Sequence, residues 1–290
     1  MAYWQWGQPD SGHLVICVHG LTRQGRDFDV LARALCEHAG RAGSSLRVIC
    51  PDVVGRGKSD WLEDPAWYQI PVYAADMLTL LAQLHAQSPI HVLDWVGTSM
   101  GGLIGIGICG RTAAPLPQPV RKLVLNDVGP TLEWLALQRI GAYLGKSGEF
   151  ANLQEAAAAM WAISSSFGPH TPEQWLELSR HMVTPAETGG QVAGQRLRLH
   201  YDPAIAQPFR AATQASTEQG QAALWQLYEQ ISAQTLLLRG ADSDLLSRAT
   251  ATAMTQRGPR ARLVEFEGVG HAPTLTAPAQ VSVVADFLLE

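Results

Sequence analysis

Short apolar runs alternate with helix-length stretches along most of this chain, and the alternation restricts its fold more than any other feature. The runs are rich in β-branched and aliphatic residues and end at turn signals, as strands do. Helical length and apolar spacing occur at 28–39, 72–86 and 101–111. Strands that alternate with helices predict an α/β fold, with a mostly parallel central sheet flanked by helices. The six expected strands are 14–18, 46–50, 90–96, 122–125, 235–238 and 263–266.

The alternation stops in the segment 130–227. We find no convincing strand pattern there, and the helical patterns are separated by Gly and Pro. We therefore expect a helical lid inserted between two strands of one sheet. The residues on either side, 1–129 and 228–290, are expected to form a single core. The helices expected in the lid are 134–144, 153–163, 172–182 and 222–228.

The bulk composition excludes several classes of protein. A chain of 290 residues with 47% hydrophobic and 16% charged residues is typical of an ordinary globular protein. Its net charge of -5 provides no basic surface, so nucleic acid is not an expected partner. The four cysteines are scattered, without a Cys-x-x-Cys pair. The N-terminus lacks a signal-peptide pattern and no apolar stretch reaches about 18 residues, so we expect a cytoplasmic protein without a membrane span.

The strongest local signal is a Gly-x-Ser-x-Gly pattern at 97–101, centred on Ser99. It lies between the expected strand 90–96 and the helical stretch that follows. A serine on a tight strand-to-helix turn needs glycine neighbours, because larger side chains would crowd the turn. The turn exposes the hydroxyl at a helix N-terminus, where developing negative charge is stabilised. The same pattern alone occurs in ordinary turns, but its position here predicts that Ser99 is a catalytic nucleophile.

His271 is the strongest candidate for a general base. It follows Gly270 just beyond the last expected strand and precedes a C-terminal helix that is expected from about Pro278. A loop at this place can bring the imidazole toward the mouth of the serine turn. His19, at the end of the first expected strand, is interpreted as a residue that shapes the neighbouring loop rather than as the base.

Two places in the chain compete for the acid that orients this histidine. Asp127 follows the fourth expected strand, which neighbours the nucleophile strand, whereas Asp242 and Asp244 follow the fifth. Each of them also fits an ordinary role in capping a turn or helix. We favour Asp127 and leave the other two open. The acid would fix the tautomer of His271 and stabilise its protonated form.

Taken together, these motifs resemble those of the α/β-hydrolases over nearly the whole chain. The resemblance rests on the sequence HGLT at 19–22, PDVVGRGKSD at 51–60, the turn at Ser99 and the loop at His271, in that order. Four ordered motifs are far more specific than one. The order serine, acid, histidine also matches this family.

The resemblance implies further features of the site. It implies an oxyanion hole formed by the backbone N–H groups of Leu21 and Met100, a lid inserted after the family's sixth strand, and no metal or organic cofactor. Most members carry the acid where this chain has Ser243. The chain is also similar to a branch of small esterases whose acid follows the sixth strand in an Asp-x-x-Pro context, which Asp127 and Pro130 fit.

These observations predict a serine hydrolase that cleaves a small-molecule carboxylic ester through a Ser-His-Asp triad and an acyl-enzyme. The alternatives are a ligand-binding or receptor-like homologue with slow turnover, and an acyltransferase. The sequence does not indicate an oligomeric state.

The tryptophans Trp134, Trp161 and Trp175 of the lid either line an acyl pocket or pack in the core, and Trp61 and Trp67 are candidates for the mouth of the site.

Overall fold

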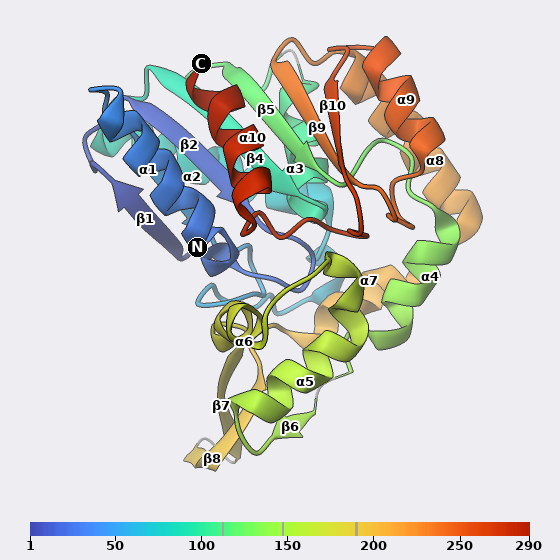
Figure 1. Ribbon diagram of the computed structural model, residues 1–290. Coiled ribbons are helices and arrows are strands. Elements are labelled where there is room, and N and C mark those ends of the chain that lie inside the picture. The colour runs from blue at the N-terminus through green and yellow to red at the C-terminus, as the bar shows by residue number, and fades with distance from the viewer. Residues whose placement is uncertain (112, 147, 189–190) are drawn as a thin grey trace.

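A seven-stranded sheet forms the centre of the computed structural model, which describes residues 1–111, 113–146, 148–188 and 191–290 (Figure 1). The strand order is β1-β3-β2-β4-β5-β9-β10. The pair β1 and β3 is antiparallel and the other neighbouring pairs are parallel, so the predicted mostly parallel sheet is confirmed. The strands are β1 (Tyr3–Gly7), β2 (His13–Val18), β3 (Arg47–Pro51), β4 (Val92–Thr98), β5 (Val120–Asn126), β9 (Gln234–Gly240) and β10 (Arg262–Phe266).

Six of these strands coincide with the expected runs, and β1 is the one that the sequence did not predict. It lies at the edge of the sheet, where its one partner among the described strands is β3. None of its residues is fully buried. Because an edge strand keeps one side in water, it lacks the continuous apolar run that marks a central strand.

Helices cover both faces of the sheet. The side chains of Leu14 and Ile16 on β2 face a core formed with α2 and α3, whereas Val15 and Cys17 face the core formed with α1 and α10. No helix of the described residues is both long and apolar enough to cross a membrane. The helices of this core are α1 (Asp29–Arg41), α2 (Ile70–Gln87), α3 (Met100–Cys109), α8 (Gln214–Glu229), α9 (Arg248–Gln256) and α10 (Pro278–Leu289).

The inserted segment, residues 130–227, contains strands as well as helices. The expectation that it is purely helical is wrong, because β6, β8 and β7 form an antiparallel sheet. The sequence of β8 does alternate arginine and leucine from Arg196 to Leu199, but Pro185 and glutamate in its partner β7 obscure the pairing. The elements are α4 (Trp134–Tyr143), β6 (Glu149–Phe150), α5 (Leu153–Ser164), α6 (Pro172–Arg180), β7 (Val183–Thr188), β8 (Gln191–Leu199) and α7 (Ala206–Ala211).

The inserted segment leaves the sheet after β5, the fifth strand along this chain, so the expected position after a sixth strand differs by one from the chain's own count. Helices α5 and α6 and the small sheet form the lower part of the molecule in Figure 1, below the central sheet. In contrast, α8 packs on α3, and its residues Trp225 and Leu227 join the main core. The last helix of the segment therefore belongs structurally to the face of the central sheet.

Candidate active site

Ser99 lies at the turn between β4 and α3, as the Gly-x-Ser-x-Gly pattern predicts. Its backbone has φ 51 and ψ -114, so this non-glycine residue lies in the left-handed region. The two glycines are required by their neighbours. A Cβ at Gly97 would overlap the backbone of Gly101, and a Cβ at Gly101 would overlap the carbonyl of Val18 on β2. The turn can form only because both positions lack a side chain.

His271 lies on the loop between β10 and α10, and its ring faces Ser99. The distance between Ser99 Oγ and His271 Nε2 is 2.9 Å. Three contacts fix the loop: Gly270 N donates to Ser166 O at 2.6 Å, Ser166 Oγ donates to the His271 carbonyl at 3.3 Å, and Asn126 Nδ2 donates to Pro273 O at 2.8 Å. Both the sheet and the inserted segment therefore position the imidazole.

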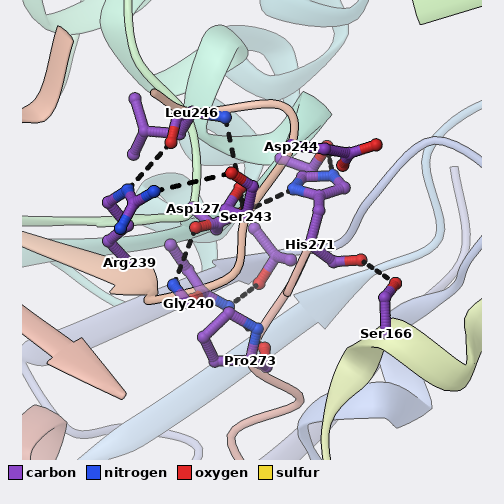
Figure 2. A network of polar contacts seen from close by, with 12 residues as sticks. Asp127, Ser166, Arg239, Gly240, Ser243, Asp244, Leu246, His271 and Pro273 are labelled. Carbon is purple, nitrogen blue, oxygen red and sulfur yellow. Dashed lines mark hydrogen bonds and ion pairs between the residues drawn. The ribbon is translucent and has the colours of Figure 1, made fainter. Parts of the chain in front are cut away.

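Asp127 follows β5 and faces the other side of the same imidazole (Figure 2). Its Oδ2 lies 2.7 Å from His271 Nδ1 and accepts a hydrogen bond from Ser243 Oγ at 2.6 Å, while its Oδ1 accepts one from Gly240 N at 2.9 Å. The carboxylate is completely buried, and the backbone has φ 54. Among the described residues, the partners of this carboxylate are a ring nitrogen, a hydroxyl and a backbone N–H, and no arginine or lysine is among them.

The alternative acids lie elsewhere. Asp242 is exposed, and Asp244 pairs with Arg139 of α4 through contacts of 2.6 and 2.8 Å. Ser243, the residue at the position where most family members were expected to carry the acid, instead donates its hydroxyl to Asp127. The sequence marked Ser243 as a departure from the family pattern but gave no role for it. Among the described residues, the carboxylate that bonds to His271 is that of Asp127.

The loop after β2 is held by two buried groups. His19 Nδ1 bonds to the carbonyl of Gly20 at 2.7 Å, and its Nε2 accepts from Val53 N at 2.9 Å. Burial lowers the pKa of His19 from 6.5 to about 3, so the ring is neutral near pH 7. Both nitrogens are occupied by the backbone, which supports the interpretation of His19 as a loop-shaping residue. Arg56, which is also buried, donates from Nε to the carbonyl of Leu21 at 2.8 Å.

Two cavities meet at Ser99. The base-side pocket has a volume of about 290 Å³ and includes His271, and the Met100-side pocket has a volume of about 940 Å³ and includes Met100. Leu21 lines both. Among the described residues, no group of three or more His, Cys, Asp or Glu side chains is arranged to hold a metal ion.

The aromatic residues that line these pockets differ from the tryptophans that the sequence suggested. Trp134, Trp161, Trp175, Trp61 and Trp67 are all absent from the described walls of both cavities. Trp175 is buried against Trp161, with ring centroids 5.0 Å apart, whereas Trp67 is 60% exposed. The sequence gave no signal for the aromatic side chains that do line the base-side pocket from the inserted segment, which are Tyr143, Phe150, Phe167 and Tyr201.

Comparison with known proteins identifies the family. The model of the alpha/beta hydrolase family matches residues 15–283. The chain is also 48% identical to the 3-hydroxybutyrate-oligomer hydrolase of Cupriavidus necator, over 99% of this chain and 92% of that protein. This chain belongs to the alpha/beta hydrolase family. The resemblance inferred from the motifs is thus confirmed, and with it the assignment as a hydrolase.

Two further relatives agree with this assignment. The crystal structure of an alpha/beta hydrolase from Novosphingobium aromaticivorans is 32% identical and superposes with a TM-score of 0.78, covering 99% of this chain and 92% of that one. The 2-(acetamidomethylene)succinate hydrolase of Mesorhizobium japonicum is 26% identical over 92% of this chain and 84% of that protein. Relatives with different named substrates share the fold, so the fold alone does not identify the substrate.

Proposed function

We propose that this alpha/beta hydrolase cleaves carboxylic esters, with Ser99 as nucleophile, His271 as general base and Asp127 as the acid that orients it. The observation that carries the proposal is the continuous line of contacts, 2.9 Å from Ser99 Oγ to His271 and 2.7 Å from His271 to Asp127 Oδ2. Nucleophile and base within hydrogen-bond distance, with the base oriented by a third group, form the arrangement that activates a serine.

The cycle proceeds in two steps. His271 takes the proton from Ser99 as the oxygen attacks the ester carbonyl, and the oxyanion accepts hydrogen bonds from the N–H groups of Leu21 and Met100. Collapse of this intermediate expels the alcohol, which receives the proton from His271. Water, activated by the same histidine, then hydrolyses the acyl-enzyme. Both proposed oxyanion residues line the Met100-side pocket beside Ser99, which supports their assignment.

The proposed substrates are oligomers of 3-hydroxybutyrate, by analogy with the relative from Cupriavidus necator. The inserted segment 130–227 is proposed to act as a lid that covers the bound ester. Two contacts support this role: Arg139 pairs with Asp244 of the core, and Ser166 bonds to the loop of His271. Such a cover would exclude bulk water while the charged intermediate forms.

A fluorophosphonate probe tests the nucleophile directly. Wild-type protein should be labelled and should release p-nitrophenol from p-nitrophenyl butyrate, and both activities should vanish together in Ser99→Ala. Ser164→Ala is the matched control, because Ser164 lines the same base-side pocket from α5. Labelling that persists in Ser99→Ala would overturn the assignment of the nucleophile.

The products distinguish the class of reaction. Incubation with a 3-hydroxybutyrate trimer should release shorter hydroxy acids, measured by liquid chromatography. If an added alcohol diverts most of the acyl group into a new ester, the enzyme is an acyltransferase. Absence of both labelling and turnover in the wild type would favour a ligand-binding homologue.

A further inference from the structure

The two cavities at Ser99 differ in charge. Cationic side chains line the base-side pocket, whereas Asp64 is the charged side chain among the described residues that line the Met100-side pocket. In the base-side pocket, Arg23 pairs with Asp27 at 2.6 Å and Arg139 pairs with Asp244 at 2.6 Å. These two cations are therefore already neutralised.

Among the described residues that line the base-side pocket, Lys146 is the remaining cation. It follows α4 in the inserted segment, and it is exposed. In the part of the chain that the structure describes, no carboxylate lies within 4.0 Å of its Nζ. An ammonium group at the wall of a largely apolar cavity is a ready partner for an anionic group of a ligand.

The chemistry of ester cleavage decides which part of the substrate enters this pocket. The histidine that takes the serine proton must return it to the leaving alcohol, so that alcohol has to lie on the imidazole side of the serine. His271 lines the base-side pocket, and Met100, whose N–H is proposed to hold the oxyanion, lines the other. The leaving alcohol therefore occupies the base-side pocket and the acyl chain occupies the larger Met100-side pocket.

We propose that the leaving alcohol carries a free carboxylate, which Lys146 binds, and that the enzyme shortens hydroxyacid oligoesters from their carboxyl end. This inference rests on the proposed function. Ser99 Oγ attacks the ester carbonyl that precedes the terminal unit, the bond from that carbonyl to the terminal unit's oxygen breaks, and the oxygen receives the proton from His271. One free hydroxy acid departs. Water then releases the shortened oligomer from Ser99.

The relative sizes of the cavities fit this direction of cleavage. The base-side pocket, of about 290 Å³, is the smaller and suits a short leaving unit, while about 940 Å³ remains for the rest of the oligomer. The apolar side chains of Leu103, Leu137 and Phe209 line the larger pocket and suit the methyl groups of a hydroxyacid chain.

A labelled trimer tests the direction of cleavage. A 3-hydroxybutyrate trimer with carbon-13 in its carboxyl-terminal unit should release labelled monomer first in a quenched time course measured by mass spectrometry. Early monomer without the label, or equal amounts of both, would overturn the inference. Hydrolysis of p-nitrophenyl butyrate, run in parallel, shows whether Ser99 is active, so loss of the proposed function is distinguishable from a wrong direction.

A second experiment tests Lys146. The ratio of kcat/KM for the free-acid dimer to that for its methyl ester should fall about tenfold in Lys146→Met, because the methionine keeps most of the length of the side chain without its charge. Lys146→Arg should keep most of the ratio. Arg41→Gln, which removes a cation from the exposed end of α1, is the control and should leave the ratio unchanged. A ratio equal to that of wild type in Lys146→Met would overturn the assignment of this lysine.

Discussion

Asp94 and Asp127 are both completely buried, at opposite ends of the parallel strands β4 and β5, and each contacts a histidine. Asp94, near the start of β4, lies 2.7 Å from His13 Nε2, whereas Asp127, beyond the end of β5, lies 2.7 Å from His271 Nδ1. The second ring nitrogen of His271 meets Ser99. Burial and a histidine partner are therefore common to both places, and neither property by itself marks an active site.

The difference lies in the other partners of each carboxylate. Arg121 donates to both oxygens of Asp94 and so neutralises its charge. The partners of Asp127 besides His271 are a backbone N–H and the hydroxyl of Ser243. In the proposed mechanism, its negative charge is thus available to the imidazolium that forms on His271. A buried carboxylate without a permanent cation is the feature that separates the proposed catalytic cluster from the structural one.

The largest expected effect comes from Asp127→Asn. Its kcat on p-nitrophenyl butyrate should fall by about 10⁴-fold, because the amide cannot stabilise the imidazolium and favours the wrong tautomer of His271. Steady-state kinetics with a circular dichroism spectrum checks this result. Activity within tenfold of wild type would contradict the comparison and return attention to Asp242 and Asp244.

Asp94→Asn should have the opposite profile. Loss of the charge leaves Arg121 and His13 without their common partner and should lower the free energy of unfolding by about 2 kcal/mol, while kcat stays within about twofold. The measurement is urea unfolding at pH 7 beside the activity assay. A large loss of kcat with unchanged stability would abolish the distinction between the two clusters.

The same variant should change the pH dependence of stability. Burial alone would raise the pKa of Asp94, but hydrogen bonds from His13 and Arg121 lower it below its ordinary value. The stabilising contribution is therefore complete above the unfolded pKa of about 4 and is lost as the pH falls through the lower folded value. The stability of Asp94→Asn should accordingly decline less than that of wild type in this acid range.

A smaller effect is expected from Ser243→Ala. Removing the hydroxyl leaves Asp127 with one hydrogen-bond donor fewer, and kcat should fall about tenfold with little change in KM. Ser243→Thr retains the hydroxyl and should recover most of the rate, which distinguishes positioning of Asp127 from a general loss of packing. An unchanged kcat in the alanine variant would show that Gly240 N–H alone holds the carboxylate.

The smallest effect is expected from Asp244→Asn. Its pair with Arg139 is substantially exposed, with 47% and 40% of the two side chains accessible, so its loss should cost less than about 1 kcal/mol. The kcat for p-nitrophenyl butyrate should stay within about twofold of wild type. A loss comparable to that of Asp127→Asn would identify Asp244 as the acid.

The central strands of the fold were predictable because parallel strands buried on both faces are mostly apolar. The runs that became β2, β4 and β9 are mostly apolar, although β4 contains Asp94 and β9 ends with Arg239 and Gly240. In contrast, β1 lies at an edge, and β7 and β8 pair with each other outside the main core. Contacts with particular neighbouring residues stabilise these strands, and the pattern of a single sequence carries little information about such contacts.

The sequence indicated part of the proposed site. Ser99 and His271 lie in short glycine-containing motifs that can be recognised locally, whereas the choice of Asp127 needed the order of neighbouring strands. The hydrogen bond from Ser243 to Asp127 and that from Arg56 to Leu21 join residues far apart in the chain. Such contacts form only in the folded chain, so a local sequence pattern does not predict them.

The contact between Ser166 and the loop of His271 has a consequence for engineering. A chimera in which residues 130–227 are exchanged for those of another family member would lose the carbonyl that accepts from Gly270 N and the hydroxyl that donates to the His271 carbonyl. An inserted segment chosen only for the shape of its pocket would therefore leave the loop of His271 without these two hydrogen bonds. A transplanted segment has to contain an equivalent turn at the position of Ser166. Exchanging the segment will therefore change the substrate range and the catalytic rate at the same time.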